Sequence, residues 1–535
     1  AMQVHHNGTI DSHLARQTGG RGLVLAWPLL FASGLAVLGF LPVVTRNPHL
    51  LWSIWGAAAF VGTWNVLLLA KSLTRKRRLT VEVGLRKQHY VQACAQVSIF
   101  LYWGWHWREV YDSGYLLAAQ LLFAYAVDML LAFSRRDTYT LGFSPVPVIF
   151  SINLFLWFKA DWFYLQFLLI AVGFAVKDFI RWNVGGRSVH IFNPSSFPLG
   201  LFSLVLLLTG TSSITWAYEI ANTLNYPPQI YLFIFLVSLP GQLLFGVATM
   251  TMSAGVTMYL FGLFYFALTG TYYFFDSYIP IAVFLGMHLL FNDPSTSPRT
   301  ELGRIMFGVL YALSVVAIYA VLDRAAVLTV YDKLLAVPIM NLMIQAIDRV
   351  ARAKVLRRFN PAGIAKSLTG PRRNLAYIGV WTTVFIAIST AQGVGDSHRG
   401  EWVPFWQQAC AEGRPYGCRN LGTLVSNYCR SGSGWACNEF GILLNPRQQP
   451  QFAARAFRDA CDFGFDPGCA NLESGTSNTF RRASPGIADY PIILQGAKGP
   501  IRNLTPLELY ARACVQGFSD GCQKAKSAIG TEPPS

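Results

Sequence analysis

Charge is scarce in this 535-residue sequence, because only 13% of its residues are Asp, Glu, Lys or Arg. An ordinary soluble domain carries about 25% charged residues, so the shortage argues against a soluble globular protein. The sequence also lacks a Gly-x-Gly-x-x-Gly motif after an expected strand, and it lacks a cysteine cluster suited to an iron–sulfur centre. These absences exclude a soluble dinucleotide-binding domain and an iron–sulfur protein.

The charge that is present is mostly positive. A net charge of +16 raises the question of a nucleic-acid partner. Lys and Arg, however, occur in short clusters between long apolar runs, and 53% of all residues are hydrophobic. This pattern indicates an integral membrane protein that contacts the lipid bilayer, and no nucleic-acid partner is expected.

Thirteen apolar runs are candidates for membrane-spanning helices. They lie at 23–44, 51–70, 90–107, 115–133, 143–158, 163–179, 197–208, 230–249, 252–269, 279–291, 305–322, 334–347 and 375–390. About 20 apolar residues are needed to cross a bilayer, and the fifth, seventh, tenth and twelfth runs are short, which suggests re-entrant or broken helices. We therefore predict an all-α fold, a polytopic transmembrane helical bundle of about 11–13 spans.

The basic clusters fall on alternate connections between these runs. They lie at 71–78, 135–136, 177–187, 299–304 and 349–373. The connections near 112–113 and 212–228 have almost no Lys or Arg. Since cytoplasmic loops carry the excess of Lys and Arg, we predict a cytoplasmic tail (1–21), a transmembrane domain (22–392) and a periplasmic region (393–535) in the bacterial inner membrane. The first run can act as its own signal.

Eight of the nine cysteines lie in the last region, in four pairs with the same Cys-x7-Cys spacing. The pairs are Cys410 and Cys418, Cys429 and Cys437, Cys461 and Cys469, and Cys514 and Cys522. Structural zinc sites usually place cysteines two to four residues apart, whereas disulfides persist outside the cytoplasm. We therefore predict four disulfides, each joining one helix end to the next helix. The ninth cysteine, Cys94, is expected to be a small buried side chain within a span.

The cysteine-rich region resembles Sel-like repeats, which are related to tetratricopeptide repeats. The stretches ACAEGRPYGCRNLG, DACDFGFDPGCANL and RACVQGFSDGCQKA carry the Ala-Cys, Gly and Gly-Cys placement of these repeats. The resemblance covers about 402–529, and a Ser-, Gly- and Pro-rich insertion at 474–500 departs from it. It implies a small disulfide-stapled α-helical repeat domain that binds a periplasmic protein partner. A folded cap without a ligand remains the alternative.

A few ionisable side chains interrupt the apolar runs. Such residues are functional candidates by default. His89 and His106 stand 17 residues apart, about 25 Å along a helix, so one metal cannot bind both. His89, His106, His190 and His288 could be haem ligands in another pairing, although structural histidines are the favoured interpretation. Asp128 either pairs with a cation near the interface or takes part in proton transfer.

Three segments together carry a family resemblance. GRSVHIFNPSSF at 186–197 and GMHLLFNDPSTSPRTELGRIMFGVLYAL at 286–313 resemble segments of the NqrB/RnfD-like family, the membrane proteins shared by sodium-pumping NADH:quinone oxidoreductases and Rnf electron-transport complexes. A third segment, YDKLLAVPIMNLMIQAIDR, is similar through Ala336, Asn341 and Asp348. In the second segment the matching places are taken by Asp293, Pro294, Thr296, Thr300, Gly303, Phe307 and Gly308. The likeness covers about 177–350.

This resemblance implies electron transfer or coupled ion transport within a larger complex. Members of the pumping complexes carry FMN on a Thr in a Ser-x-Ala-Thr-like motif. The stretch GVATMTMSAGVTM offers only Thr249 and Thr257, and neither reproduces that motif. Covalent FMN is therefore not expected, whereas noncovalent flavin, quinone and haem all remain compatible with the sequence.

The resembling segments also have a physical interpretation of their own. Asn193-Pro194 and Asp293-Pro294 each place a proline after a side chain suited to capping a helix. One such break in each half is expected of inverted-repeat membrane proteins, whose half-helix ends face a central site. Since helix N-termini favour anions, we predict either an anionic-ligand site on the cytoplasmic side or two capped loops that hold the fold together. The candidate binding residues are Arg187, His190, Asn193, Asp293, Thr296, Arg299 and Thr300.

Three functions follow from these features. The first is a membrane component of a redox or coupled-transport complex, whose partners are the other subunits. The second is a transporter for a small anionic or flavin-like solute. The third is a noncatalytic scaffold that binds a periplasmic partner through the repeats.

Overall fold

A computed structural model describes residues 18–19 and 23–529, apart from 185, 276, 357–358, 362–367, 369, 392–393, 395–397, 445–448, 475–479 and 496–503. Most of the expected tail (1–21) and parts of the 474–500 insertion and of the basic cluster at 349–373 therefore lie outside the described residues. Helix makes up 74% of the structure and sheet almost none, which confirms the all-α class.

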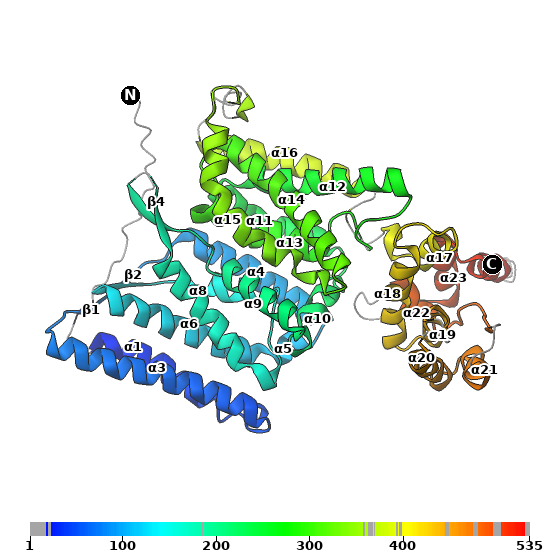
Figure 1. Ribbon diagram of the computed structural model, residues 1–535, viewed down its shortest axis with the longest axis horizontal. Helices are drawn as coiled ribbons and strands as arrows, with labels where there is room; N and C mark the ends of the chain where they lie inside the picture. Colours follow the sequence, from blue (N-terminus) through cyan, green and yellow to red (C-terminus); the bar gives the residue numbers. More distant parts are fainter. Residues whose placement is uncertain are drawn as a thin grey trace, which may run out of the picture.

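Each of the thirteen predicted runs contains a helix. The helices of the first part of the chain are α1 (Ala26–Leu38), α2 (Pro42–Thr45), α3 (Pro48–Thr74), α4 (Lys87–His106), α5 (Glu109–Asp112), α6 (Gly114–Arg135), α7 (Pro145–Asn153), α8 (Tyr164–Phe179), α9 (Ser196–Thr209), α10 (Ala217–Thr223), α11 (Ile230–Phe245), α12 (Ala248–Thr269), α13 (Ile281–Leu289), α14 (Glu301–Arg324), α15 (Asp332–Ala351) and α16 (Gly370–Thr390), of which the short α5 and α10 lie between predicted runs. Figure 1 shows them gathered in one bundle.

Among the described residues, five segments are long and apolar enough to cross a membrane. They are α3, α6, α12, α14 and Thr329–Ala351, which adds a short turn to α15. The twelfth run, predicted to be short, thus extends to a full span. The nine-residue helices α7 and α13 reach only about 14 Å, half of a bilayer core, as expected for broken helices. These features are compatible with a multi-pass membrane protein.

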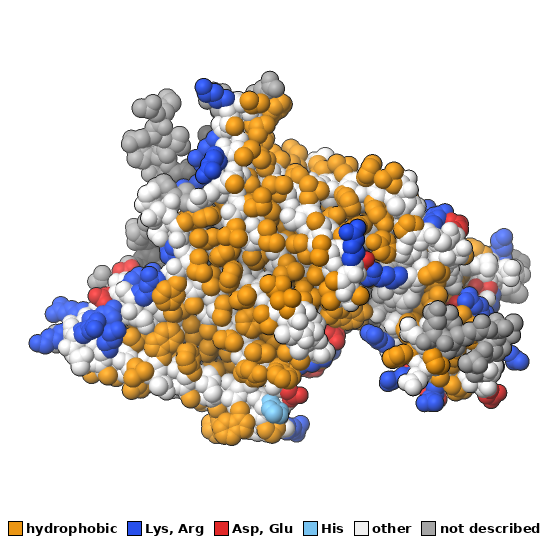
Figure 2. Space-filling model, in the orientation of Figure 1, with side chains coloured by type: hydrophobic (Ala, Val, Ile, Leu, Met, Phe, Trp, Pro, Cys, Tyr) orange, Lys and Arg blue, Asp and Glu red, His pale blue; other side chains and the backbone are white. Residues whose placement is uncertain are grey.

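The outer face of the bundle is apolar. Figure 2 shows hydrophobic side chains over most of its width, with Lys and Arg mainly around its margins. Large side chains such as Trp52 and Leu208 are 70% and 79% exposed, which would be costly in water. Contact with the acyl chains of a bilayer explains this surface. Cys94, expected to be buried, is also exposed, since it lies on the outer side of α4.

Short strands lie at one end of the bundle. Strand β2 (Thr80–Val83) pairs in parallel with β3 (Thr138–Leu141) and antiparallel with β1 (Thr18–Gly19). The segment before Asn193 forms an antiparallel hairpin of β4 (Arg181–Val184) and β5 (Arg187–His190). No sequence pattern predicted this hairpin, whose two strands are only four residues each.

The described parts of the five basic clusters lie at this same end. Arg77 donates to Asp137 beside the second cluster (Nε–Oδ1 2.7 Å), and Arg136 pairs with Asp178 in the third (2.9 Å). His190 then contacts Asp293 at 3.1 Å, next to the fourth cluster. The fifth joins through Asp348, which accepts from the Arg299 amide at 3.1 Å. The bundle therefore has one basic end, as the alternation of clusters along the sequence predicts.

Close approach of helix backbones shapes the core around α14, which packs between α12 and α15. A Cβ atom on Gly308 would overlap the carbonyl oxygen of Met250 on α12. A Cβ atom on Gly200 of α9 would lie 2.8 Å from the carbonyl oxygen of Leu334 on α15. Small residues at crossings permit the van der Waals contact that holds membrane helices together.

The cysteine-rich region forms a second helical body at the opposite end (Figure 1). Its helices are η8 (Arg399–Glu401), α17 (Val403–Ala411), α18 (Gly417–Arg430), α19 (Gly434–Leu443), α20 (Pro450–Asp462), α21 (Asp466–Ser474), α22 (Tyr490–Gln495), α23 (Pro506–Gln516) and α24 (Ser519–Ile529). All four predicted cysteine pairs are at disulfide distance, with Cα–Cα separations of 4.3–4.6 Å. As predicted, each joins one helix to the next.

Burial should set the order in which these disulfides are reduced. Cys429 and Cys437 are 8% and 0% exposed, whereas Cys418 is exposed. Because a reductant must reach the sulfur atoms, we expect Cys410–Cys418 to be reduced first and Cys429–Cys437 last. Stepwise reduction followed by thiol alkylation and peptide mass spectrometry measures this order. Cys429 labelled before Cys418 would contradict the arrangement of helices in this domain.

Candidate functional site

The first predicted break connects the β4–β5 hairpin to α9. The Asn193 side chain is buried, and its Oδ1 atom accepts hydrogen bonds from the amides of Ser195 (2.9 Å) and Ser196 (3.2 Å). Its Nδ2 atom donates to the carbonyl oxygen of Leu290, just beyond α13, at 3.1 Å. The predicted capping role is confirmed, and the same side chain also ties the first break to the second.

The second break is capped in the same way. Asp293 precedes the short 3-10 helix η4 (Pro294–Thr296), and its Oδ1 atom accepts from the Ser295 amide at 2.9 Å. Its Oδ2 atom lies 3.1 Å from Nε2 of His190 at the end of β5. Two breaks that are 100 residues apart in sequence therefore share direct contacts.

Helix α15 closes this junction from a third side. The Oδ1 atom of Asn341, which is fully buried, accepts from the Asn193 amide at 3.2 Å. One turn before the end of α15, Asp348 accepts from the Arg299 amide (3.1 Å) and the Thr300 hydroxyl (3.2 Å). The Thr300 hydroxyl oxygen in turn caps α14 by accepting from the Gly303 amide at 3.0 Å. We call this set of contacts the break junction.

The structure brings together most of the predicted binding residues. His190, Asn193, Asp293, Thr296, Arg299 and Thr300 all belong to the break junction. Their hydrogen bonds run to one another and to neighbouring groups of the protein such as Asn341 and Asp348, which favours the alternative in which the breaks hold the fold together. Arg187 lies in β5, but its side chain is outside the described part of the structure.

The two threonines considered for flavin attachment lie far from each other along α12. The Thr249 hydroxyl is buried and donates to Glu301 Oε2 at 3.0 Å, and Glu301 pairs with Arg304 at 2.7 Å. A flavin phosphate does not fit there, because the Glu301 carboxylate would repel it and no surface is exposed for it. Thr257 lies eight residues further along α12, about 12 Å away, and is partly buried.

The four histidines considered as haem ligands are dispersed. His288 packs against Phe284 with the ring centroids 4.1 Å apart, and its Nδ1 atom lies 2.7 Å from the Phe284 carbonyl oxygen. The cavity beside it is about 10 Å³, far too small for a porphyrin. His89 and His106 lie at opposite ends of α4, and His190 contacts Asp293. Among the described residues, no group of three His, Cys, Asp or Glu side chains could hold a metal ion.

Asp128 belongs to a separate polar contact near the basic end. Its Oδ1 atom lies 3.4 Å from Lys177 Nζ, and its Oδ2 atom accepts from the Tyr139 hydroxyl at 3.1 Å. The cation that it pairs with is therefore Lys177 of α8, and neither of the arginines that follow it in sequence. The ion-pair alternative for Asp128 is the one that the structure supports.

An aromatic cavity of about 550 Å³ lies between α4, α6 and α7. Its rings come from Phe100, Tyr111, Tyr115, Phe150, Trp157, Phe158, Phe163 and Trp216. Its polar side chains include Gln120 and Asn153, which exchange hydrogen bonds of 2.9 and 2.7 Å. Pockets of this size and mostly apolar lining hold small molecules and cofactors.

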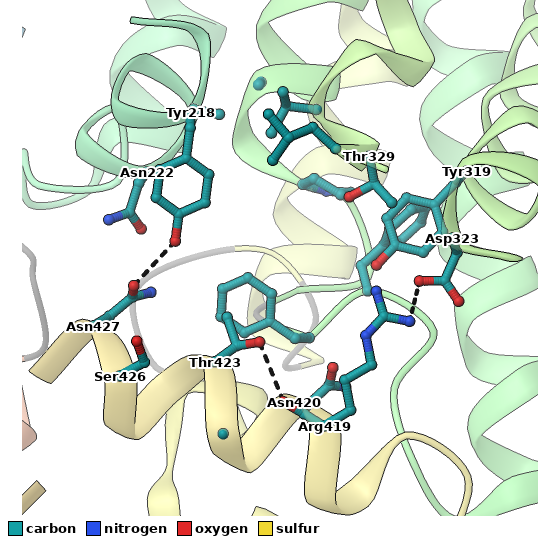
Figure 3. A pocket seen from close by; sticks show the side chains of 18 of the residues that line it. Tyr218, Asn222, Tyr319, Asp323, Thr329, Arg419, Asn420, Thr423, Ser426 and Asn427 are labelled. Carbon is teal, nitrogen blue, oxygen red and sulfur yellow. Dashed lines mark hydrogen bonds and ion pairs between the residues drawn. The ribbon is translucent and has the colours of Figure 1, made fainter. Parts of the chain in front are cut away.

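A second, larger cavity of about 910 Å³ lies between the bundle and the repeat domain (Figure 3). We call it the chamber. Helix α18 forms one wall, and α10 and α14 form the other. Arg419 pairs with Asp323 across it, and the Tyr218 hydroxyl donates to Asn427 at 3.1 Å. Since α14 runs about 36 Å from Glu301 to Arg324, the chamber and the basic end are at opposite ends of the bundle.

The chamber residues were not predicted from the sequence. Asp323 and Arg419 are 96 positions apart and belong to different domains, so no spacing rule connects them. Their only sequence signal is that each is a charged residue at a helix end. Asn341 was noticed only through the family resemblance, although an amide within an apolar run is itself a signal.

The comparisons with known proteins return nothing. No family model, no curated protein and no solved structure matches this chain.

Removing the Asn193 side chain should destabilise the bundle. In the Asn193→Ala variant, the Leu290 carbonyl and the amides of Ser195 and Ser196 lose their hydrogen-bond partner, although they remain buried. Buried groups without partners cost about 1–3 kcal/mol each, so the melting temperature should fall clearly. Thermal unfolding in lipid nanodiscs measures this fall. Asn183→Ala on the exposed face of β4 is the matched control and should unfold like wild type.

Asp293 should contribute a stability that depends on pH. Burial alone raises the pKa of its carboxyl, but the hydrogen bond and charge of His190 and the Ser295 amide outweigh burial and lower the pKa below 3.8. A lowered pKa means that the carboxylate stabilises the fold above pH about 4 and that this contribution is lost as the pH falls further. Asp293→Asn should therefore unfold at a lower temperature than wild type at pH 7.

The difference between the two melting temperatures should shrink as the pH falls below about 4. Melting curves of both proteins between neutral and acid pH provide the measurement. A difference that does not change with pH would show that the carboxylate charge is unimportant and that only the shape of the side chain matters.

Proposed function

We propose that the protein is a membrane component of an electron-transfer or coupled-transport complex. The observation that carries the proposal is the break junction, in which two proline-marked helix breaks from separate parts of the chain meet around the buried Asn193 and the partly buried Asp293. Broken helices that meet in this way are the architecture of membrane proteins built from inverted repeats. The resemblance to the membrane proteins of sodium-pumping and Rnf complexes rests on these same segments.

The aromatic cavity is the place that best suits a redox group. A quinone ring or a noncovalently bound flavin is flat, mostly apolar and edged with carbonyl groups. The cavity offers ring faces from Trp157 and Phe163 and side-chain amides from Gln120 and Asn153. An amide carries two N–H donors. Gln120 uses one of them to bind Asn153, whereas Asn153 uses both, one to Gln120 and the other to the Ile149 carbonyl oxygen, so Gln120 is the amide with a donor to offer. When bound, such a group would accept and pass on electrons.

The orientation of the protein belongs to the same proposal. The basic end would face the cytoplasm, and the repeat domain would lie in the bacterial periplasm, where its disulfides persist. The exposed helix surfaces of the bundle would contact lipid and the other subunits, and the repeats would contact a periplasmic protein.

A solute transporter is the second candidate, and the chamber favours it. The chamber lies beyond the outer ends of α14 and α15, where a solute could collect before it enters the bundle. Uptake into vesicles without any electron donor would distinguish transport from electron transfer.

The redox proposal predicts a chromophore. Protein purified gently from its native membrane should carry flavin, with absorbance near about 450 nm, or extractable quinone, and should retain partner subunits. Val97 lines the aromatic cavity, so Val97→Trp should fill it and remove the bound group. Val66→Trp on the outer surface of α3 is the matched control. A colourless wild-type protein without flavin or quinone would overturn the redox proposal.

A further inference from the structure

The chamber has the size and position of a ligand-binding site. At about 910 Å³ it is at the upper end of the range for small-molecule pockets, about 300–1,000 Å³. Both domains contribute walls, and sites between domains are common because neither domain alone must fill the space. The side chains on each wall therefore decide which ligand would fit.

Helix α18 presents a row of uncharged hydrogen-bonding groups to the chamber. Asn420, Thr423 and Asn427 follow one another at intervals of three and four residues, so they share one side of the helix, and Ser426 lies one turn after Thr423 on the same side. Figure 3 shows these side chains directed toward the bundle. The opposite face of α18 buries Leu421, Leu424, Val425 and Tyr428 in the repeat domain. The polar face is therefore turned away from its own domain.

Disulfides at both of its ends fix the position of α18. Cys418 near the start of the helix is joined to α17, and Cys429 near its end is joined to α19. The polar row is thereby held in place before any ligand arrives. A site that is rigid in advance loses less conformational entropy on binding.

The facing wall continues the same chemistry. Tyr218, Asn222 and Asn225 come from α10 and the turn after it, and Tyr319 and Thr329 come from the outer end of the bundle. Amides and hydroxyls can each donate and accept hydrogen bonds. Both walls are therefore suited to a ligand with many hydroxyl groups.

The charges at the chamber are balanced in pairs. Asp323 pairs with Arg419 across the cavity. Asp332 and Lys333, which are 2% and 5% exposed, form a pair of 3.5 Å. Arg430 also lines the chamber, but it is exposed to solvent. A cationic ligand would have to break one of these pairs or leave its own charge without a partner, which is costly in a partly buried place. An anionic ligand could reach Arg430, but water and salt screen the charge of this exposed side chain.

Aromatic rings add apolar faces between the polar groups. Phe274, Phe275 and Phe440 line the chamber together with Tyr218 and Tyr319. A sugar ring has polar edges and apolar C–H faces, so it can form hydrogen bonds at its rim while a face packs on an aromatic side chain.

We propose that the chamber binds a small, neutral, polyhydroxylated solute of the size of a monosaccharide or disaccharide. The polar row of α18, the hydroxyls and amides of the facing wall, and the internally paired charges all point to this class of ligand. This inference goes beyond the proposed electron-transfer function and does not depend on it.

Calorimetric titration of the full-length, oxidised protein tests the proposal. Lipid nanodiscs avoid detergents with sugar headgroups, which would compete for the chamber. The neutral probes are glucose, N-acetylglucosamine, maltose and trehalose, and the charged analogues are glucuronate and glucosamine. At least one neutral sugar should bind, and the analogue with a carboxylate or an ammonium group should bind more weakly than glucose.

A matched pair of variants locates the binding. The hydroxyls of Thr423 on α18 and Thr383 on α16 each donate to the carbonyl oxygen four residues earlier, at 3.2 and 3.0 Å. Only Thr423 lines the chamber. Thr423→Val should weaken binding about threefold to tenfold, the value of one neutral hydrogen bond, and Thr383→Val should leave it unchanged. Ser426→Trp should fill the chamber and abolish binding.

Three outcomes would overturn the proposal. The first is that none of the four neutral sugars binds to a correctly folded protein. The second is that glucuronate or glucosamine binds more tightly than every neutral sugar. The third is that a sugar binds equally well to wild type and to the folded Ser426→Trp variant, which would place the site elsewhere.

Discussion

The rest of the bundle depends on the hydrogen bonds of Asn193. Its buried side chain caps α9 and donates to the carbonyl oxygen of Leu290, just beyond α13. Its backbone amide donates to the side chain of Asn341 on α15. In an environment without water, each broken helix leaves polar groups that only the protein can satisfy. The breaks are therefore tolerated because the polar groups at each break form hydrogen bonds within the break junction. The packing of α9, α13, α14 and α15 follows from that requirement.

At the other end of the molecule, disulfides constrain the repeat domain. The repeat domain is small, and four short disulfide loops join α17 to α18, α18 to α19, α20 to α21 and α23 to α24. Helix α18 is fixed at both ends, so its polar face stays turned toward α10 and α14. The Asp323–Arg419 and Tyr218–Asn427 contacts then join the two domains around a cavity instead of closing it.

The two ends of the bundle thus differ in chemistry as well as in charge. The basic end is a closed network of capped helix ends, whereas the opposite end contains the chamber. The aromatic cavity lies between α4, α6 and α7, and all of its lining residues except Trp216 precede the first break in sequence. A redox group there and a solute in the chamber would bind at separate places, so each can be removed without the other.

The sequence by itself determined the helices, the basic end and the disulfides, because hydropathy, charge clusters and the Cys-x7-Cys spacing act over short distances. It also identified Asn193 and Asp293 as helix caps, since each precedes a proline. Only the tertiary structure decided that these caps meet, that Asp128 pairs with Lys177 and that Asp323 faces Arg419. Those partners are 49 to 100 positions apart, and their meeting depends on how whole helices pack, which no local pattern of residues encodes.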